Sequence, residues 1–416
     1  MYYNYRISDK LVELSKVVEK DISPIFAEID DMTMLNSAKV LRALQEVGIT
    51  YSDFVEVSGY GYEDIGRDKL EKVYAKIFGA EDALVRTQIM SGTHALNITF
   101  DGLLHHGDTM ISITGIPYVS VQSIIGLSGD SKHSLINNGI NYEQIELIDD
   151  DFDIPTIVSR LKQSKVRLVE IQRSRGYAQR KSLSIDKIER VISEIRKVDN
   201  DVIIMVDNCY GDLVEDREPT EVGADILVGS HMKNLGGGLC KTGGYIVGKK
   251  NLVSEIADRL SAPCVGKELG VNFNENMNFF KGLYLAPRTI NSALKTMVFA
   301  SAMLEKLGYE VSPRYDEHRT DIIQTIRLKS DKEMIEFCQG LQKGMPINSK
   351  NIVRPYIVPG YKDKEVSASG AFTKGATIEL SADGPICDPY TIYMQGSLSY
   401  EYGKLGVMIA LNDITK

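Results

Sequence analysis

The chain has 416 residues, 43% of them hydrophobic and 25% charged, with a net charge of -9 at pH 7. This composition is typical of an ordinary globular protein, and the length exceeds what one core supports, so we expect one large and one small domain. The acidic balance, without a basic stripe, argues against a nucleic-acid or anionic-membrane surface.

The five cysteines and the N-terminal residues indicate the compartment. No two cysteines form a CxxC pair, and their scatter does not resemble a disulfide framework. The first residues show no basic leader, and no stretch approaches the roughly 18 apolar residues of a membrane span. We therefore expect a soluble cytoplasmic protein whose partner is a small molecule.

The N-terminal region reads as helical over residues 8–48, where apolar residues recur at spacings of three and four. A Gly/Tyr-rich stretch, 58–67, follows, and Leu70, Val73 and Ile77 then share one face of a further helix. A helical arm, a loop and a helix are predicted.

Strand and helix patterns alternate from about 80 to 250. Strands are predicted at 108–114, 166–172, 202–207 and 226–230, and helices at 92–104, 153–164 and 186–198. Such alternation predicts crossover units on a mainly parallel sheet, in which ligands bind at the carboxyl ends of the strands.

The C-terminal part predicts a small α+β domain. A segment rich in Asn, Phe and Met (271–285) precedes Pro287, and a helical pattern follows to about Leu307. The remaining pattern comprises a strand at 322–328, a helix at 331–343, a loop at 359–375, a strand at 376–382 and a helix at 399–412. The predicted division is an arm (1–50), a large domain (51–285) and a connector with a small domain (286–416).

The most informative segment is Gly229-Ser-His-Met-Lys233-Asn-Leu-Gly-Gly-Gly238, where a lysine follows a strand and precedes three glycines. A lysine at a strand end beside permissive backbone is placed to enter a pocket, although a surface lysine near a glycine turn has the same pattern. No GxGxxG opens a helix after a first strand, which argues against a nicotinamide cofactor.

The preceding strand, Val202-Ile-Ile-Met-Val-Asp207, ends in a carboxylate. A carboxylate at the edge of a buried strand is costly unless it has a partner. A pyridinium nitrogen is such a partner, since an ionised aspartate keeps that nitrogen protonated and the ring electron-poor. The alternative is an aspartate in a loop or at a helix N-cap.

Two more turns lie at the predicted ligand edge. Ser91-Gly92-Thr93 opens directly into a helix, where backbone amides, hydroxyls and the helix dipole favour a phosphate, although a plain helix cap has the same sequence. Tyr118 follows the strand at 108–114 and is placed to stack on an aromatic ring or to cover a helix end. Together the four parts favour pyridoxal 5'-phosphate (PLP).

In this order the motifs resemble the fold-type-I PLP enzymes of the cystathionine and methionine lyase class. More closely, the stretches 59–67, 230–234 and 378–385 resemble a bacterial family known both as methionine gamma-lyase-like and as aluminium-resistance proteins. The resemblance covers about residue 40 to the end. It implies an α/β fold-type-I transferase fold, with a mainly parallel sheet in the large domain and a small C-terminal α+β domain.

The resemblance also assigns roles to residues. Lys233 would form the Schiff base and act as the catalytic base, Asp207 would pair with the pyridine nitrogen, and Tyr118 would stack on the ring. The phosphate would be held by Ser91, Gly92, Thr93 and Ser230. In the lyase class a tyrosine and an arginine reach the neighbouring subunit's phosphate, and Tyr60, Tyr62 and Arg67 are the nearest matches here, at a stretched spacing. Tyr62 and Arg67 are the predicted pair, and Tyr62 or Tyr118 would protonate a leaving sulfur.

One position departs from the lyase pattern. The class has a substrate-carboxylate arginine before Leu-Ser in a C-terminal strand, and here that residue is Glu379. A guanidinium remains the natural partner of an α-carboxylate, so Arg354, Arg173 or Arg175 is the predicted replacement.

The resulting hypothesis is a carbon–sulfur lyase that converts an amino acid to a keto acid, ammonia and a thiol, with an active site shared within a dimer or tetramer. The alternatives are another PLP reaction (transamination, decarboxylation or aldol cleavage) and a stress-response protein of this fold without turnover. The six scattered histidines argue against a catalytic metal, and His231, beside Lys233, either touches the cofactor or packs.

Overall fold

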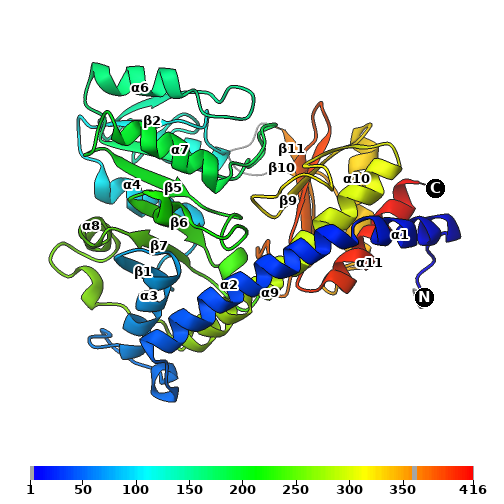
Figure 1. Ribbon diagram of the computed structural model, residues 1–416, viewed down its shortest axis with the longest axis horizontal. Coiled ribbons are helices and arrows are strands. Elements are labelled where there is room, and N and C mark those ends of the chain that lie inside the picture. Colours follow the sequence, from blue (N-terminus) through cyan, green and yellow to red (C-terminus); the bar gives the residue numbers. More distant parts are fainter. Residues whose placement is uncertain (1–3, 358–362, 416) are drawn as a thin grey trace. The chain divides into compact units, whose positions relative to one another are not determined.

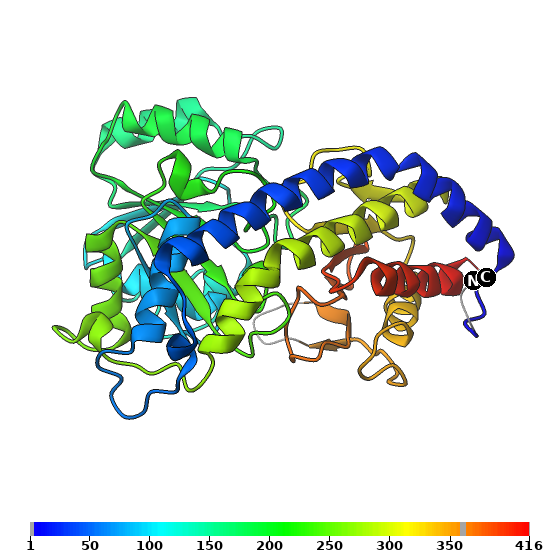
Figure 2. The ribbon, with the colours of Figure 1, turned by 60° about the horizontal axis from the view of Figure 1, so that its bottom comes forward.

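A computed structural model describes residues 4–357 and 363–415 (Figures 1 and 2). The chain divides into two units, one formed by residues 38–284 and the other by residues 1–37 together with 285–416. The three-part domain division predicted above stays a prediction.

The unit of residues 38–284 is built on a seven-stranded sheet with the order β1-β7-β6-β5-β4-β2-β3. Its strands are β1 (Asp82–Arg86), β2 (Thr109–Ser112), β3 (Asn141–Gln144), β4 (Leu168–Gln172), β5 (Ile203–Asp207), β6 (Ile226–Ser230) and β7 (Gly244–Gly248). The five strands from β3 to β6 are parallel, whereas β7 is antiparallel to both β6 and β1. The predicted mainly parallel sheet is present.

Helices cover both faces of this sheet (Figure 1). They are α3 (Ile65–Ile77), α4 (Gly92–Leu103), α5 (Val119–Ile125), α6 (Ile154–Gln163), α7 (Ile185–Arg196) and α8 (Lys250–Leu260). Successive residues of a strand point to opposite faces: Met205 packs with α4, α5 and α8, and Val206 packs with α6 and α7. Every residue of β5 is therefore buried, as its unbroken apolar sequence predicts.

The second unit contains a six-stranded antiparallel sheet with the order β10-β11-β12-β13-β9-β8. Its strands are β8 (Glu310–Ser312), β9 (Ile323–Arg327), β10 (Tyr356–Ile357), β11 (Lys364–Ser369), β12 (Ser381–Pro385) and β13 (Thr391–Gln395). Its helices are α1 (Asp9–Asp21), α10 (Asp331–Lys343) and α11 (Tyr400–Ile414), with parts of α2 (Ser23–Val47) and α9 (Asn276–Lys306). Asn291 of α9 donates hydrogen bonds to Asp30 and Thr33 of α2, which holds these two helices side by side.

Three sequence predictions differ from the structure in this part of the chain. Helix α9 begins at Asn276 and runs through Pro287, because buried residues such as Phe279 and Leu283 anchor the turns before the proline. β11 lies inside the segment predicted as a loop, of which residues 359–362 fall outside the described part. Its small and polar residues hide the strand, although Val366 and Ala368 are buried at the strand period.

The strand predicted at 376–382 begins only at Ser381, because Glu379 caps a turn instead of pairing in a ladder.

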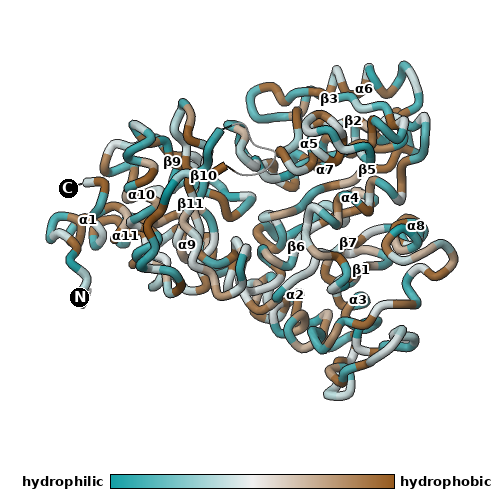
Figure 3. Tube along the Cα trace, turned by 180° about the vertical axis from the view of Figure 1, so that it is seen from behind, coloured by the Kyte–Doolittle hydropathy of each residue, from teal (hydrophilic) through white to brown (hydrophobic). Residues whose placement is uncertain are grey.

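Hydropathy is mixed along the whole chain. Figure 3 shows short hydrophilic and hydrophobic stretches in alternation. Among residues 4–357 and 363–415, no helix has the length and apolar character that a membrane span requires.

Candidate active site

Two neighbouring parallel strands end in polar residues at the same edge of the large sheet. Asp207 is the last residue of β5 and Ser230 is the last of β6, and each is only 3% exposed. The Asp207 carboxylate accepts a hydrogen bond of 3.0 Å from the backbone N–H of Cys209. By strand alternation from Met205, Asp207 lies on the sheet face that α4 and α5 cover.

The start of α4 approaches this edge closely. Ser91 caps the helix, since its hydroxyl accepts a hydrogen bond of 3.1 Å from the backbone N–H of His94. A β-carbon placed on Gly92 would lie 3.1 Å from Cβ of Ser230 and 3.4 Å from Sγ of Cys209. Glycine therefore allows the helix start to approach Ser230 closely without displacing it. Backbone amides, hydroxyls and the helix dipole converge there in a cradle suited to a phosphate.

Lys233 follows β6 and lies among the same residues. Its backbone N–H bonds to the Ser230 carbonyl oxygen at 3.2 Å, and its Nζ lies 4.4 Å from the centroid of the Tyr210 ring. Burial disfavours the ammonium, but the acidic side chains around it, among them Cys209 and Asp207, outweigh burial and raise the pKa of Lys233. A pyridinium beside Lys233 would act in the opposite direction, because a neighbouring positive charge lowers the pKa of a lysine.

Tyr118 precedes α5, and its backbone N–H bonds to Oε1 of Gln172 at 3.0 Å. The phenol is hydrogen-bonded to Thr93, and burial together with the Asp207 charge raises its pKa, against an opposing effect of Lys233. The structure thus brings together all the residues predicted for the ring, the phosphate and the Schiff base, which are Ser91, Gly92, Thr93, Tyr118, Asp207, Ser230 and Lys233.

The glycines after Lys233 serve the backbone of the lysine loop. A β-carbon on Gly236 would lie 1.7 Å from the His231 carbonyl oxygen, and one on Gly237, at φ +55°, would lie 2.4 Å from the Gly282 carbonyl oxygen. Asn234 fastens the loop, because its Nδ2 donates to the carbonyl oxygens of Tyr210 at 3.0 Å and Asp212 at 2.9 Å.

The predicted inter-subunit pair occupies two different environments. Tyr62 is 60% exposed, with its ring centroid 6.2 Å from that of Tyr60. Arg67 is buried and donates to the carbonyl oxygens of Gly61 at 2.9 Å and Gly270 at 3.0 Å. These contacts hold the Gly/Tyr-rich loop in place, so phosphate binding by Tyr62 and Arg67 stays a prediction.

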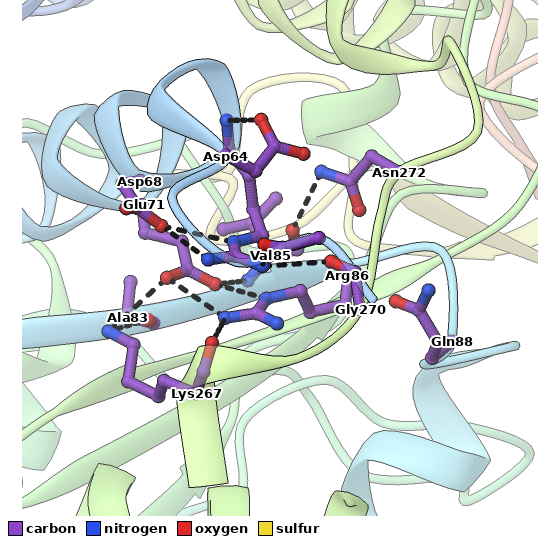
Figure 4. A network of polar contacts seen from close by, with 12 residues as sticks. Asp64, Asp68, Glu71, Ala83, Val85, Arg86, Gln88, Lys267, Gly270 and Asn272 are labelled. Carbon is purple, nitrogen blue, oxygen red and sulfur yellow. Dashed lines mark hydrogen bonds and ion pairs between the residues drawn. The ribbon is translucent and has the colours of Figure 1, made fainter. Parts of the chain in front are cut away.

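A buried ion network lies beside this loop, between α3 and β1 (Figure 4). Arg86 bonds to Glu71 at 2.6 Å, and Lys267 lies 3.2 Å from Glu71 and 2.5 Å from Asp82. Arg86 also donates to the carbonyl oxygens of Leu269 at 2.7 Å and of Lys267 at 3.0 Å. Burial works against ionisation of Glu71, but Arg86 and Lys267 hold its pKa below the ordinary value.

The candidate substrate arginines differ in burial. Arg173 is fully buried and donates to Asn208 at 2.7 Å, to Glu215 at 2.6 Å and to the Gly211 carbonyl oxygen at 2.9 Å, which favours a structural role. Arg175 is also buried, whereas Arg354 is exposed in the second unit. Their role in substrate binding stays a prediction.

Glu379, in place of the lyase-class arginine, accepts hydrogen bonds from the backbone N–H groups of Phe372 at 2.8 Å and Thr373 at 3.0 Å. Its carboxylate therefore organises the turn before β12.

His231 packs in an aromatic cluster. Its Nε2 is 2.9 Å from the Tyr74 hydroxyl, and its ring contacts those of Phe279 and Tyr245. Burial lowers its pKa to about 3, so the ring is neutral. Within the described ranges, no group of three or more His, Cys, Asp or Glu is arranged to hold a metal ion.

Three site residues were not singled out in the sequence: Cys209, Tyr210 and Asp212. They lie two to five residues beyond Asp207, in the segment that leaves the ligand edge of β5. That position is the one signal that would have found them, because residues after a strand's carboxyl end line the ligand edge of such a sheet.

Relatives share nearly the whole chain. The Uncharacterized protein YnbB of Bacillus subtilis (strain 168) is 41% identical over 401 residues, which is 95% of this chain and 94% of YnbB. The crystal structure of a proposed cystathionine beta-lyase involved in aluminum resistance from Clostridium acetobutylicum superposes with a TM-score of 0.96 at 43% identity, over 99% of this chain and 97% of the other. A carbon-sulfur lyase involved in aluminum resistance from Clostridium novyi NT gives a TM-score of 0.94 at 42% identity, over 98% and 96%.

A more distant structure extends the comparison of folds. The pyridoxal-5'-phosphate dependent protein YhfS of Escherichia coli superposes with a TM-score of 0.61 at 15% identity, over 91% of this chain and 95% of YhfS. The predicted fold class, a fold-type-I α/β architecture, is confirmed. The profile of the family described as Methionine gamma-lyase matches residues 11–415. As its motifs predicted, the chain belongs to the methionine gamma-lyase family.

Proposed function

We propose that this protein is a PLP-dependent carbon–sulfur lyase that holds its cofactor on Lys233. One observation carries the proposal: Lys233, Asp207 and the capped start of α4 converge at one edge of the sheet, where a β-carbon on Gly92 would lie only 3.1 Å from Cβ of Ser230. Membership of the family and the names of the two clostridial relatives support the same class of reaction.

The residues present fit the cofactor. Ser91, Gly92, Thr93 and Ser230 would hold the phosphate, Asp207 would pair with the pyridine nitrogen, and Tyr118 would lie against the ring. When bound, PLP supplies an electron sink for a carbanion at the substrate α-carbon. Asp207, which is buried, would keep the pyridine nitrogen protonated and the ring therefore electron-poor.

The protein's own residues would carry the proton transfers. Lys233 would serve as the base that takes the substrate α-proton, and the side chains around it favour the ammonium that results. Tyr118 has a raised pKa and therefore keeps its proton at neutral pH, ready to donate it to a leaving sulfur. Tyr62 is the alternative donor, and Arg354, Arg173 or Arg175 would bind the substrate carboxylate.

We further propose a cytoplasmic homo-oligomer, a dimer or tetramer, whose active site is shared between subunits. Tyr60, Tyr62 and Phe273 are large hydrophobic side chains that are 74%, 60% and 65% exposed, and contact with a second copy would cover them. Small-angle scattering of the protein, with Tyr62→Ala for comparison, tests the assembly.

Borohydride reduction of the protein as purified with PLP, followed by peptide mapping, tests the cofactor site. We expect a pyridoxyl group on Lys233 and loss of the visible absorbance. A label on another lysine would overturn the assignment.

A panel of amino acids, monitored for keto acid and for thiol, tests the reaction. Release of both in equal amounts supports elimination. Keto acid without thiol would favour the second candidate, another PLP reaction, for which the observation is Glu379 in place of the arginine of the lyase class. Bound PLP without any turnover would favour a stress-response role, in line with the aluminium resistance named for the relatives.

A further inference from the structure

The ring of Tyr210 faces the amine of Lys233. Nζ of Lys233 lies over the face of this ring, 4.4 Å from its centroid, and both residues are partly buried. The face of an aromatic ring is negative, so it attracts an ammonium at such a distance, and more strongly where little water is present. A neutral amine carries no charge for the ring to attract, so the contact favours the charged form of Lys233.

The backbone of Tyr210 has a conformation that aromatic residues rarely adopt. Its φ is +71°, in the left-handed region, where a bulky side chain crowds its own backbone. Glycine adopts this conformation without strain, but the glycine of this segment is the next residue, Gly211. Strained residues of this kind cluster at active sites, where the surrounding structure holds them. The conformation therefore indicates that the direction of the Tyr210 ring is required.

Hydrogen bonds hold this strained segment in place. Nδ2 of Asn234 donates to the carbonyl oxygens of Tyr210 at 3.0 Å and of Asp212 at 2.9 Å. Between them, the Gly211 carbonyl oxygen accepts a hydrogen bond of 2.9 Å from Nη1 of Arg173, which is fully buried. Three successive carbonyl oxygens are thus bound. Because Asn234 directly follows the lysine in the sequence, its side chain also fixes the Tyr210 backbone to the lysine loop.

We propose that Tyr210 is a positioning residue whose ring face holds the ammonium of Lys233 at the sheet edge where the cofactor would bind. The inference rests on the proposed function for the role of Lys233 as anchor and base. A base that has taken the substrate α-proton carries a positive charge, and the ring gives this charge a fixed place. The strained backbone of Tyr210 and its bond to Asn234 set the distance between ring and amine.

Other titratable groups also act on the lysine. Cys209, Tyr118 and Asp207 favour its charged form, and the lysine in turn lowers the pKa of Asp212. Each of these groups stays in the chain when only the side chain of Tyr210 is changed. Substitutions at Tyr210 therefore measure what the ring adds to the effect of the acids.

Tyr210→Leu tests the proposal, with Tyr210→Phe as the matched control. Leucine removes the ring, whereas phenylalanine keeps the ring and removes only the hydroxyl, which is itself titratable. In the cofactor-free full chain, mass spectrometry follows acetic-anhydride labelling at Lys233 as a function of pH, and the midpoint gives the lysine pKa. The midpoint is compared instead of the rate, because removal of a ring also changes access to the amine. Lys241, an exposed lysine paired with Glu275, is the internal reference.

We expect Tyr210→Leu to lower the lysine pKa by roughly 0.5 to 1, which raises the share of neutral amine below the midpoint about three- to tenfold. Tyr210→Phe should change it much less, because the ring remains. Tyr210→Gly removes the ring together with the backbone strain and should lower the pKa as leucine does, so it replaces Tyr210→Leu if that variant does not fold. The labelling profile of Lys241 should be the same in all variants.

Two results would overturn the inference. One is a lysine pKa that stays at the wild-type value in Tyr210→Leu and Tyr210→Gly, since the ring would then contribute nothing. The other is an equal fall in Tyr210→Phe and Tyr210→Leu, since the hydroxyl and not the ring face would then be responsible.

The outcomes separate this inference from the proposed function. A borohydride label on Lys233 together with an unchanged lysine pKa in the variants removes only the role of Tyr210. A lysine pKa that falls in Tyr210→Leu but not in Tyr210→Phe, without any label on Lys233, removes the proposed function and leaves the contact between ring and ammonium.

Discussion

Two groups of charged side chains in the unit of residues 38–284 differ in their balance of acids and bases. Between α3 and β1, Glu71 lies between Arg86 and Lys267, so each charge faces an opposite charge (Figure 4). In a second group, beyond the end of β5, the carboxyl groups of Asp212, Glu215 and Glu218 are accompanied by one guanidinium, that of Arg173. Oδ2 of Asp212 is buried and has no hydrogen-bond partner among the described residues. The first arrangement lowers the pKa of its acid, whereas the second raises it.

The balance of acids and bases thus determines whether a buried carboxyl group is ionised at neutral pH. The balanced group stays ionised, and its Arg86 holds the backbone at Lys267 and Leu269 to β1. An excess of buried acids raises the pKa of Asp212 to about 8, because burial and the neighbouring Glu218 disfavour its ionised form. Perturbed groups of the second kind are typical of functional sites.

Lys233→Ala should have the largest effect of the variants, and it should act on catalysis and not on stability. We expect catalysis to fall by about 10³-fold or more, since the variant loses both the cofactor anchor and the base, while thermal stability stays close to wild type. Keto-acid release and calorimetry measure the two effects. Lys241→Ala, which removes an exposed lysine paired with Glu275, is the control and should retain full activity.

Glu71→Gln should act mainly on stability, because Glu71 lies in the balanced group and outside the proposed active site. Removal of the acid leaves the buried Arg86 without its carboxylate partner, which should lower the free energy of unfolding by roughly 3–5 kcal/mol. Urea unfolding measures this loss. Glu13→Gln, which breaks the exposed pair with Lys16, should cost less than about 1 kcal/mol. A comparable loss in both variants would contradict the contrast drawn here.

Stability should respond to pH with opposite signs in the two groups. The ion pairs of Glu71 contribute fully above the unfolded pKa of 4.5 and are lost as the pH falls through the lower folded pKa. Asp212 holds a proton in the folded protein between its ordinary pKa of 3.8 and about 8, so the free energy of unfolding falls as the pH rises through this window.

Asp212→Asn should flatten this fall, which for one proton amounts to at most about 1.4 kcal/mol per pH unit. Urea unfolding between pH 5 and 8 measures it. An unchanged slope would mean that Asp212 ionises in the folded protein as it does in the unfolded chain.

Ser91→Ala should have a small effect on stability. Loss of the cap on α4 should lower the free energy of unfolding by about 1 kcal/mol, and PLP should bind more weakly because a phosphate donor is gone. Ser184→Ala removes the equivalent cap of α7, away from the sheet edge. Both variants should lose similar stability in urea, and only Ser91→Ala should raise the PLP concentration needed for half-saturation.

Local pattern determined much of the large unit. The unbroken apolar run that ends at Asp207 predicted a buried parallel strand, and the lysine, the aspartate and the Ser-Gly-Thr turn predicted their common edge, because parallel strands place their carboxyl ends together. The same signals were weak in the second unit, where β11 is made of small and polar residues whose burial depends on β12 beside it.

Short motifs were enough to predict the family, the fold class and the residues that converge around Lys233, since each of these residues lies next to a strand end or a helix start. The partners of charged residues could not be predicted in this way. Arg67 bonds to the carbonyl oxygens of Gly61 and Gly270, and Arg173 bonds to Asn208 and Glu215. The Asp212 carbonyl oxygen accepts a hydrogen bond from Asn234 of the lysine loop. The physical reason is that the partner of a charged side chain is chosen by burial and by residues far away in the sequence, which no local pattern contains.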